Sequence, residues 1–357
     1  MRWRQAYREA AIRASGGGTD YTLAVFIIAD GNNLAWAGYH ALRRSMPIDT
    51  PAQKIRVALL GLTQSVLGLA VRGGEPPEAG APGAIARRNA GKATRLAIAF
   101  DHGRPLRRRI VWPQYQMGRE SDPQFAENEV HILAAIAQFI EMAKMLPVEI
   151  YRGVNTEADD LIAYAVLHSE GLVRVASSDR DFLQLVDERM SIYSPLKRVV
   201  VDLTNFDDQA APRSADKKPV YFPRERYLDY RAASGDTSDD LPGIPGLGTI
   251  GAARLLAMFP LDEYLAEPVL AGRALGRQNL RLSQALRSGE AATVVARNRV
   301  LMDLRAAAAR YESLEEMTQV GAWDEQAFRA WFTGQRIAGL ELEAAVRAME
   351  GVAIAHP

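Results

Sequence analysis

Apolar runs of strand length alternate with helical patterns through the first half of the chain. The runs are YTLAVFIIAD (21–30), TRLAIAFD (94–101), VEIYRGV (148–154), GLVRVASSD (171–179) and MSIYS (190–194). Between them, apolar residues recur every three or four positions at 55–71 and at 125–145, which is the period of a helix packed on one face. Strands that alternate with helices predict a parallel sheet with crossover helices, so we expect an α/β fold.

The composition outside these runs predicts how the chain is divided. Residues 1–20 have the pattern of a flexible N-terminal arm that ends in a glycine-rich link, and we expect the α/β domain at 21–201. Within that domain, the Gly-, Pro- and Ala-rich segment 72–94 is typical of a mobile loop. The polar segment 202–219 is expected to be a linker. Residues 220–357 show only helix and turn patterns, which predicts a second, helical domain.

The residue types available restrict any metal site to oxygen ligands. The chain has no cysteine among its 357 residues, which excludes disulfides and thiolate metal ligands. None of its five histidines is paired at ligand spacing. Carboxylate oxygens are therefore the expected ligands, and they favour a hard cation such as Mg²⁺ or Mn²⁺.

Charge and hydropathy narrow the choice of partners. Lys plus Arg equals Asp plus Glu at 43 each, so the chain lacks the overall basicity of many nucleic-acid-binding proteins, although RPLRRR (104–109) is locally basic. The longest apolar run, LAVFIIA (23–29), is too short to cross a bilayer, and the N-terminus lacks an apolar signal core. We expect a cytoplasmic monomer without membrane contact.

Acidic residues follow the ends of the predicted strands. They are Asp30, Asp101, the group Glu157, Asp159 and Asp160, and the pair Asp179 and Asp181, while the stretch GDTSDD (235–240) adds Asp236 and Asp239. An acidic residue after a strand is often only a turn residue or a helix cap, and acids in a first helical turn complement the helix dipole. That interpretation does not explain why the feature recurs at four strand ends.

These side chains are expected to meet in one pocket, because the carboxyl ends of parallel strands lie on one edge of a sheet. Seven to nine carboxylates in one place would repel one another and have raised pKa values unless cations neutralise them. Two divalent ions about 4 Å apart fit such a ring and favour phosphodiester hydrolysis. The sequence therefore predicts a two-metal site.

Five stretches of the chain occur in an order that a known family shares. They are IADGNNL (28–34), AFD (99–101), TEADDLIA (156–163), SSDRDFLQL (177–185) and YRAASGDTSDDLPGIPGLGTIGAARLL (230–256). Together they resemble the 5′ nucleases, which include flap endonucleases, the 5′-nuclease domain of bacterial DNA polymerase I and stand-alone phage relatives. The resemblance implies a PIN-like α/β sheet flanked by helices, followed by a helical region with a helix-hairpin-helix element.

The resemblance also implies roles for single residues. Metal-ligand roles fall on Asp30, Asp101, Glu157, Asp159, Asp160, Asp179, Asp181, Asp236 and Asp239. An arch over the active site is implied at 102–128, with Arg119 and Gln116 in catalytic positions and DNA contacts at Arg107, Arg108 and Arg109. The glycine-rich turn implies contacts to duplex DNA by Gly243, Gly246, Gly248, Thr249, Gly251 and Arg254. Family members often hold a K⁺ ion in this turn.

Two positions depart from the family pattern. Gln116 stands where relatives usually carry a lysine in the arch, so a neutral amide replaces a cation near the scissile phosphate. Ile250 stands where relatives often carry a lysine in the hairpin, and Arg254, one turn later, is the candidate replacement. Cleavage slower than the family norm is expected unless Arg119 and the arginines at 107–109 compensate.

We therefore expect a divalent-metal-dependent 5′-3′ exonuclease or flap endonuclease that acts on 5′ flaps, nicked DNA or 5′-ended duplex DNA in replication or repair, in a bacterium or a phage host. Two alternatives are a PIN-like ribonuclease, which typically lacks the hairpin, and a flap- or junction-binding protein with weak catalysis because of Gln116. GLGTIG (246–251) also fits a dinucleotide-binding pattern, but the prolines before it exclude a central strand there.

Overall fold

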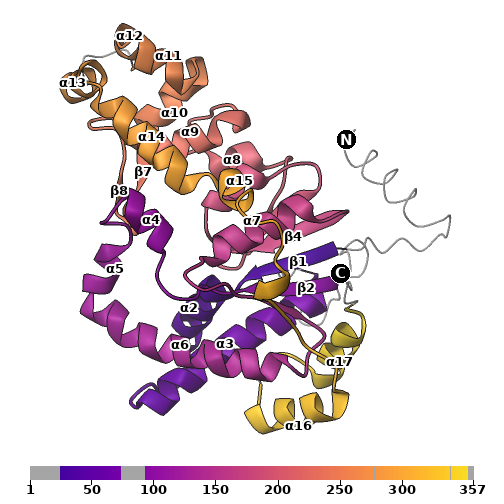
Figure 1. Cartoon of the computed structure of the whole chain (residues 1–357). Helices are drawn as coiled ribbons and strands as arrows, with labels where there is room; N and C mark the ends of the chain where they lie inside the picture. Colours follow the sequence, from indigo (N-terminus) through magenta and orange to yellow (C-terminus); the bar gives the residue numbers. More distant parts are fainter. Residues whose placement is uncertain (1–24, 74–92, 276–278, 338, 353–357) are drawn as a thin grey trace, which may run out of the picture.

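A seven-stranded sheet forms the centre of the molecule (Figure 1). The computed structural model describes residues 25–73, 93–275, 279–337 and 339–352. The arm expected at 1–20 and positions 74–92 of the expected loop lie outside the described residues. In the described part the strand order is β6-β5-β4-β1-β2-β3-β9, and the edge strand β6 (Val199–Val201) pairs antiparallel with β5. The expected parallel α/β sheet flanked by helices is confirmed.

The central strands are parallel. β1 (Val25–Asp30) is buried along its whole length and pairs with β2 (Ala93–Ala99) on one side and β4 (Leu172–Ala176) on the other. β3 (Glu149–Tyr151) extends the parallel set beyond β2, and β5 (Met190–Ser194) extends it beyond β4. Because these strands all run the same way, their carboxyl ends share one edge of the sheet.

Helices cover both faces of the sheet, since alternate residues of a strand point to opposite faces. Val25, Ile27 and Ala29 enter one hydrophobic cluster, whereas Phe26 and Ile28 enter another. The first cluster includes residues of α2 (Gly31–Leu42), α3 (Pro51–Arg72) and α6 (Pro123–Ala143). The second includes residues of α7 (Ala158–His168), η1 (Asp181–Leu185) and α8 (Phe206–Ala210). The sheet is thus buried between two layers.

α3 is a core helix that crosses α2 at very short range. A Cβ added to Gly38 would lie 2.5 Å from the backbone of Gly61, and the reverse also holds, so the two backbones touch at these glycines. By length and composition α3 could span a membrane, but 67% of its most apolar stretch is buried inside the protein. That burial accounts for its apolar sequence without a membrane.

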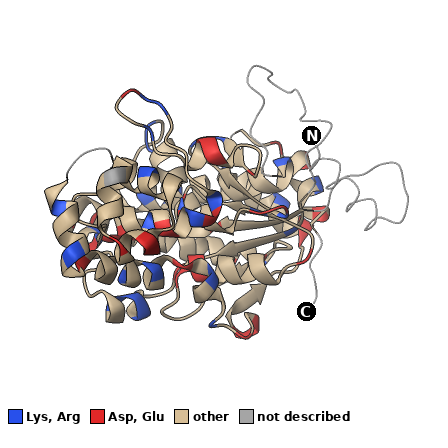
Figure 2. Ribbon diagram, turned by 90° about the horizontal axis from the view of Figure 1, so that it is seen from above, with Lys and Arg blue, Asp and Glu red and all other residues tan. Residues whose placement is uncertain are grey.

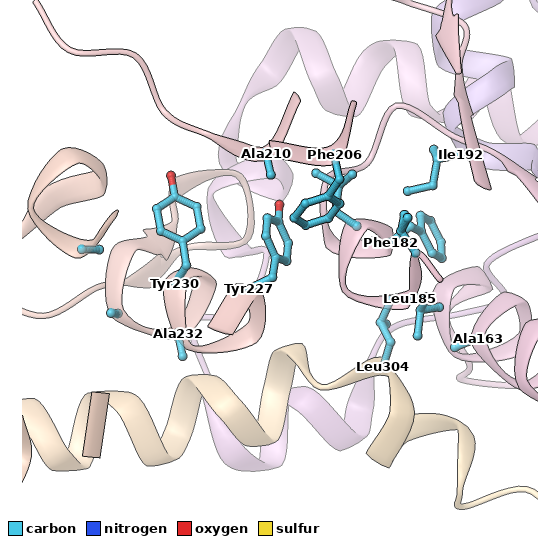
Figure 3. Close-up of a cluster of buried hydrophobic side chains, with 14 of the residues drawn as sticks. Ala163, Phe182, Leu185, Ile192, Phe206, Ala210, Tyr227, Tyr230, Ala232 and Leu304 are labelled. Carbon is cyan, nitrogen blue, oxygen red and sulfur yellow. The ribbon is translucent and has the colours of Figure 1, made fainter. Parts of the chain in front are cut away.

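The chain after residue 220 forms a largely helical region that shares the core of the sheet. Its first elements are α9 (Tyr227–Ser234), β7 (Gly235–Asp236), η3 (Thr237–Asp239), β8 (Leu241–Pro242) and α10 (Gly248–Met258). α11 (Leu261–Ala266), α12 (Val269–Leu275), α13 (Leu280–Ser288), α14 (Glu290–Met302) and α15 (Leu304–Ala308) follow. Figure 3 shows Phe182, Ile192, Phe206, Tyr227 and Leu304 in one cluster, although they come from five different elements. The sheet and the helical region therefore have one continuous core.

The structure differs from the expected division of the chain in two places. The segment 202–219, expected to be a linker, contains α8, and its Phe206 is buried with a ring centroid 5.8 Å from that of Tyr227. After the helices, β9 (Thr318–Val320) pairs antiparallel with β3, so the chain returns to the sheet. The last helices, α16 (Glu325–Gln335) and α17 (Leu342–Glu350), follow β9. Apolar side chains in an otherwise polar stretch explain the first difference.

The arch expected at 102–128 is built from short helices. It contains α4 (Leu106–Val111) and α5 (Met117–Ser121) before α6 begins. Trp112 Nε1 donates a hydrogen bond to the carbonyl of Asp240 at 2.8 Å, and the backbone of Gly118 donates to the Asp240 carboxylate at 2.6 Å. The segment between α4 and α5 is therefore attached to the loop that carries Asp239.

Candidate active site

Parallel strands deliver carboxylates to one edge of the sheet. Asp30 is the last residue of β1, and Asp101 and Asp179 come shortly after β2 and β4. Glu157 is the N-cap residue of α7, which follows β3. Because β1 lies between β2 and β4, the first three acids come from neighbouring strands.

The first turn of α7 adds further acids. Glu157 and Asp160 are 8% and 4% exposed, and Asp159 lies between them in the sequence. The helix gains little capping from them, since the Glu157 side chain makes no cap hydrogen bond. The Asp159 carboxylate makes no hydrogen bond to any residue that the structure describes, so it is available to a ligand.

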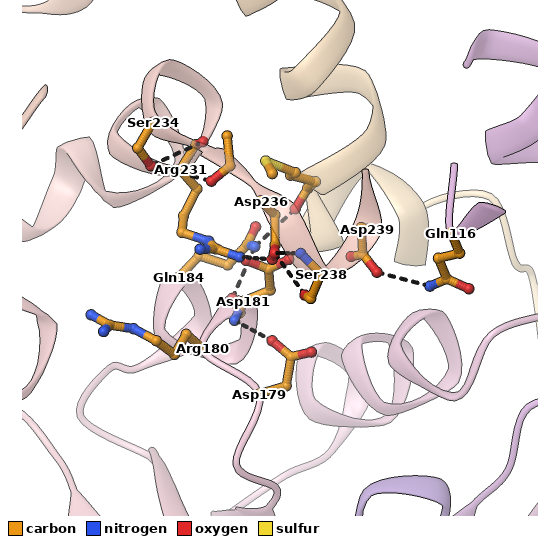
Figure 4. Close-up of polar contacts among 12 residues, drawn as sticks. Gln116, Asp179, Arg180, Asp181, Gln184, Arg231, Ser234, Asp236, Ser238 and Asp239 are labelled. Carbon is orange, nitrogen blue, oxygen red and sulfur yellow. Dashed lines mark hydrogen bonds and ion pairs between the residues drawn. The ribbon is translucent and has the colours of Figure 1, made fainter. Parts of the chain in front are cut away.

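The remaining acids come from η1 and from the start of the helical region. Asp181 opens η1, Asp236 lies in β7 and Asp239 ends η3. One carboxylate oxygen from each of these three residues lies within 4.8 Å of the other two, a spacing that could hold a metal ion (Figure 4). The stretch GDTSDD therefore joins the group at the strand ends, as its position in the sequence predicted.

The two sets of acids lie close enough for their charges to raise one another's pKa values. Burial raises the pKa of Asp179 to about 8, and the neighbouring charges of Asp181, Asp239 and Asp30 add to this rise. Burial likewise raises the pKa of Asp159, and its largest neighbouring charge is Asp179. Buried carboxylates whose pKa values are raised in this way are stabilised as anions when cations bind among them.

The other strand-end acids behave in the same manner. Burial raises the pKa of Asp30 to about 6, with a further contribution from Asp101. Burial also raises the pKa of Glu157 to about 7, against the lowering effect of Arg108. Burial acts to raise the pKa of Asp236 too, but Arg231 and Ser238 together hold it below its ordinary value.

Short hydrogen bonds fix two of these carboxylates. Asp30 accepts from the backbone of Asn33 at 2.9 Å and from the Ser177 hydroxyl at 2.8 Å. Asp101 accepts from the backbone of Ala158 at 2.7 Å, which ties the end of β2 to the start of α7. The relative positions of these carboxylates are therefore set by the backbone of the surrounding elements.

Three arginines border the carboxylates. Arg108 pairs with Glu157 and with Asp160, the latter at 2.7 Å. Arg119 pairs with Asp239 at 2.6 Å. Arg231 binds Asp181 at 2.5 Å and also Asp236 (Figure 4).

Gln116, for which a catalytic position was predicted, lies among the acids. Its amide nitrogen donates to Asp239 Oδ1 at 3.0 Å (Figure 4). The same nitrogen donates to Glu157 Oε1 at 3.3 Å. Its backbone has a φ of 58°, a left-handed conformation that is uncommon for a residue other than glycine. Tyr115, the preceding residue, donates its hydroxyl to Glu157 at 3.2 Å.

A family model describes the same part of the chain that carries these acids. Residues 25–212 match the model of the 5′-3′ exonuclease N-terminal resolvase-like domain. This match covers more than half of the chain. The chain belongs to the 5′-3′ exonuclease family. The resemblance drawn from the motifs is therefore confirmed.

Relatives of known name extend this assignment beyond the matched domain. DNA polymerase I from Mycobacterium bovis and from Mycobacterium tuberculosis are each 31% identical to the chain over 301 residues, which is 82% of this chain. The aligned part is 28% of each polymerase. The chain thus corresponds to less than a third of the length of these relatives.

Solved structures of exonucleases share the fold. A bacteriophage T5 5′-exonuclease with bound divalent zinc superposes with a TM-score of 0.58 at 18% identity, covering 92% of this chain and 99% of that one. The T5 flap endonuclease in complex with DNA and metal ions gives the same TM-score, with coverage of 91% and 98%. Human GEN1 bound to Holliday-junction DNA has a TM-score of 0.51 at 11% identity, covering 92% of this chain and 71% of that one.

The glycine-rich turn expected in the exonuclease fold lies between α9 and α10. Gly246 and Gly248 have φ values of 78° and 66°, which favour glycine. A Cβ on Gly243 would lie 2.4 Å from the backbone of Ser234, so the turn packs closely on the end of α9. Thr249 and Arg254 are exposed. Gly251, the last glycine of the predicted set, lies within α10.

The arginines at 107–109 do not share one environment. Arg107 is exposed, as a DNA contact requires, and Arg109 binds the carbonyl of Tyr115 at 3.2 Å and the Glu120 carboxylate. Arg108, expected to contact DNA, is instead only 8% exposed and donates to the carbonyl of Leu301 at 3.1 Å. The reason is electrostatic, because the buried Glu157 and Asp160 require a nearby cation.

Sequence reasoning gave no role to several residues of this site. Arg231 bridges two acids, yet in the sequence it is only one arginine in a helical pattern. Its position one turn before GD in YRAASGD was the available signal. Asn32 and Ser177 hold Asp101 and Asp30 by hydrogen bonds, and both belong to motifs that were recognised.

Proposed function

We propose that this exonuclease-family chain hydrolyses phosphodiester bonds of 5′-flap, nicked or 5′-ended duplex DNA, with Mg²⁺ or Mn²⁺ as cofactor. The named bacterial and phage relatives support a place in DNA replication or repair. Two of the structural relatives are complexes with DNA, which supports DNA as the substrate class. The cytoplasm of a bacterium or of a phage host is the corresponding location.

One observation carries the proposal: carboxylates from four strand ends and from GDTSDD interact in a single group, in which Asp30, Glu157 and Asp160 are buried and the others are half-buried. Burial and mutual repulsion raise the pKa of Asp179 to about 8, so the group is strained when it is fully ionised. If these acids had only a structural role, the Asp159 carboxylate would be expected to have a hydrogen-bond partner, and it has none among the described residues. A cation-binding role accounts for both features.

The donor set fits divalent cations of the hard class. Each ligand candidate is a carboxylate oxygen, and one oxygen each from Asp181, Asp236 and Asp239 lies within 4.8 Å of the others. Asp30, Asp101, Glu157, Asp159, Asp160 and Asp179 are the proposed ligands at the strand ends. Two divalent cations, when bound, would supply the Lewis acidity that phosphodiester hydrolysis needs.

Arginine and amide side chains of the arch complete the site on the substrate side. Arg119 pairs with Asp239, and we propose that it binds the scissile phosphate once cations take up the acids. Gln116 donates a neutral hydrogen bond from a neighbouring position. Arg231 holds Asp181 and Asp236 in place from the side of α9.

The glycine-rich turn is the proposed duplex-binding element. The exposed turn around Gly246 and Gly248 opens α10, so backbone N–H groups and the helix N-terminus can bind a phosphate. Thr249 and Arg254 add a hydroxyl and a cation on exposed positions. A K⁺ ion in this turn stays a prediction.

The decisive test replaces the acids that link the two parts of the site. Asp179→Asn with Asp181→Asn should abolish cleavage of a labelled 5′-flap duplex in Mg²⁺ or Mn²⁺, because the oxygens that hold the cations lose their charge. DNA affinity should stay within about threefold, since the turn at Gly246 is untouched. Cleavage by the double variant at a rate near that of the wild type would refute the metal site.

The same assay separates the alternative functions. The neutral Gln116 favours a second candidate, a flap-binding protein with weak catalysis, which would bind the flap tightly with little turnover by the wild type. A ribonuclease of related fold would prefer single-stranded RNA to the flap. Efficient metal-dependent cleavage of the DNA would exclude both.

A further inference from the structure

A concave pocket of about 290 Å³ lies next to the loop that carries the catalytic acids. Three chain segments each contribute a cation to its lining. Arg180 comes from the loop between β4 and η1, Lys197 from the turn between β5 and β6, and Arg213 from the segment after α8. Figure 4 shows that the Arg180 side chain points away from the carboxylates of Asp181 and Asp236. The pocket is thus separate from the carboxylate group although it shares the same loop.

Backbone carbonyls, not carboxylates, position the arginines of this pocket. Arg180 Nη2 donates to the carbonyl of Ala210 at 2.8 Å, and Arg213 Nη1 donates to that of Lys217 at 3.2 Å. Among the residues that the structure describes, no carboxylate forms an ion pair with Arg180, Lys197 or Arg213. In Figure 2, acidic and basic residues are mixed over most of the molecule. A group of cations without ion-pair partners therefore distinguishes this pocket from most of the described part of the protein.

The pocket carries an excess of positive charge. Burial lowers the pKa of Lys197, and the charges of Arg180 and Arg213 lower it further. Asp208, the acidic residue of the lining, accepts a hydrogen bond from the Tyr221 hydroxyl at 2.7 Å. Three cations therefore face one engaged carboxylate, and a bound anion would relieve the repulsion among the cations.

We propose that Arg180, Lys197 and Arg213 bind a backbone phosphate of the DNA substrate, away from the scissile bond. The proposal rests on the proposed nuclease function, which supplies the DNA. Arginine forks and a lysine ammonium are the groups that recognise phosphate oxygens. Because a strand bound at the carboxylates carries a phosphate at every nucleotide, further phosphates extend from the site along the protein surface.

The position of the pocket favours a DNA strand over a free phosphate ion. The Tyr227 hydroxyl, at the start of α9, donates to the carbonyl of Arg180 at 2.9 Å. α9 is followed by β7, η3 and β8, and then by the glycine-rich turn that we assign to duplex binding. Arg180 therefore belongs to the loop that carries the carboxylates and is also hydrogen-bonded to the helix before the duplex-binding turn. The side chains of Arg180, Lys197 and Arg213 are exposed.

The test uses the full chain with Lys197→Glu and Arg213→Glu combined. Arg180 is kept, because it lies between two proposed metal ligands. The control, Lys144→Glu with Arg347→Glu, makes the same change of net charge at two exposed positions, the C-cap of α6 and the middle of α17. Binding of a labelled 5′-flap duplex without divalent metal is followed by fluorescence anisotropy at several salt concentrations. The pocket variant should raise Kd about tenfold and reduce the slope of log K against log salt by about 1 to 2, while the control changes Kd less than twofold.

Neutral methylphosphonates placed one at a time in the flap substrate locate the contact. One or two positions should weaken wild-type binding about fivefold and have no further effect on the pocket variant. Two results would overturn the proposal. One is an equal slope of log K against log salt for the pocket variant and the control. The other is that no methylphosphonate position weakens binding of the wild type more than binding of the pocket variant.

A last experiment measures whether inorganic phosphate alone stabilises the protein. Phosphate could stabilise the wild type but not the pocket variant, while both bind DNA equally well. That result would assign the pocket to a free anion and would also overturn the proposal. Circular dichroism shows that each variant is folded. Failure of the wild type to cut any DNA would count against the proposed function, whereas loss of binding specific to the pocket variant would still support this contact.

Discussion

At the scale of single residues, Gln116 is the least expected member of the site. It adopts a left-handed backbone conformation and places a neutral amide 3.0 Å from Asp239 and 3.3 Å from Glu157. The conformation costs about 1 kcal/mol or more for a residue with a side chain. The surrounding contacts hold it nonetheless, because its backbone N–H donates to the carbonyl of Asp239 at 3.1 Å.

Gln116→Lys should speed cleavage. A lysine ammonium at this position would add a charge-assisted hydrogen bond to the phosphate, which is about twice as strong as a neutral one, so we expect kcat to rise on the order of tenfold. Single-turnover rates on the 5′-flap duplex in saturating Mg²⁺ measure this directly. Gln116→Met, which has a similar size but no donor, is the matched control and should not exceed the wild-type rate. A Gln116→Lys rate at or below wild type would contradict the arch assignment.

Arg108 shows what sequence alone could not decide at this scale. The run RPLRRR places four arginines in six positions, and nothing in the pattern separates the buried one from its neighbours. In the structure Arg108 is 8% exposed, beside Glu157 and Asp160, which are distant in the sequence. Charge complementarity between segments far apart in the chain is a tertiary property, so local pattern does not contain it.

At the scale of elements, period and length predicted most of the central fold. Apolar runs without alternation marked the buried strands, and their ends fixed the positions of Asp30, Asp101 and Asp179. β9 was missed, because three residues of intermediate or high exposure at a sheet edge carry little pattern. α8 was missed as well, since its few buried residues are surrounded by polar ones.

The turn before α10 yields a prediction at this scale. Gly246 has a φ of 78°, and a Cβ there would lie 2.9 Å from both Asn279 Oδ1 and Arg281 Cβ. Gly246→Ala should therefore lower the free energy of unfolding by about 1–2 kcal/mol and weaken binding of duplex DNA. Chemical denaturation and fluorescence anisotropy measure the two effects.

Gly272→Ala in α12 is the matched control for Gly246→Ala. Outside its own helix backbone and chain neighbours, no described atom lies within 4 Å of a Cβ at Gly272, and its φ is not positive. This substitution should therefore be neutral or stabilising by up to about 1 kcal/mol. Equal stability of the two variants would show that the turn tolerates a side chain. Loss of stability with unchanged DNA affinity in Gly246→Ala would count against the turn as a duplex contact.

At the scale of the whole molecule, the fold gathers negative charge that the sequence spreads over more than two hundred positions. The net charge of zero conceals this arrangement. Burial raises the pKa values of Asp30, Glu157 and Asp179 to about 6, 7 and 8 in the protein without bound cations. Stability of the metal-free protein is therefore linked to pH through these three carboxyls.

The sign of this linkage follows from the direction of the shifts. Because the folded-state pKa values are raised, the folded protein binds more protons than the unfolded chain above pH 4, and stability is lost as pH rises through about 6 to 8. In EDTA, Tm should fall by roughly 5 °C or more between pH 6 and pH 9. Mg²⁺ binds the ionised carboxylates, so it should raise Tm more at pH 9 than at pH 6. Differential scanning calorimetry measures both effects.

Asp179→Asn identifies the carboxyl group as the source of this pH dependence. The amide of the asparagine does not titrate, so Tm should fall less between pH 6 and pH 9 than in the wild type. The rise in Tm that Mg²⁺ causes at pH 9 should be smaller as well. Asp324→Asn changes an acid that caps α16 and is remote from the group, and should leave the fall unchanged. A metal-free Tm that stays constant or rises from pH 6 to pH 9 would mean that these acids are not held in a buried, mutually repelling group.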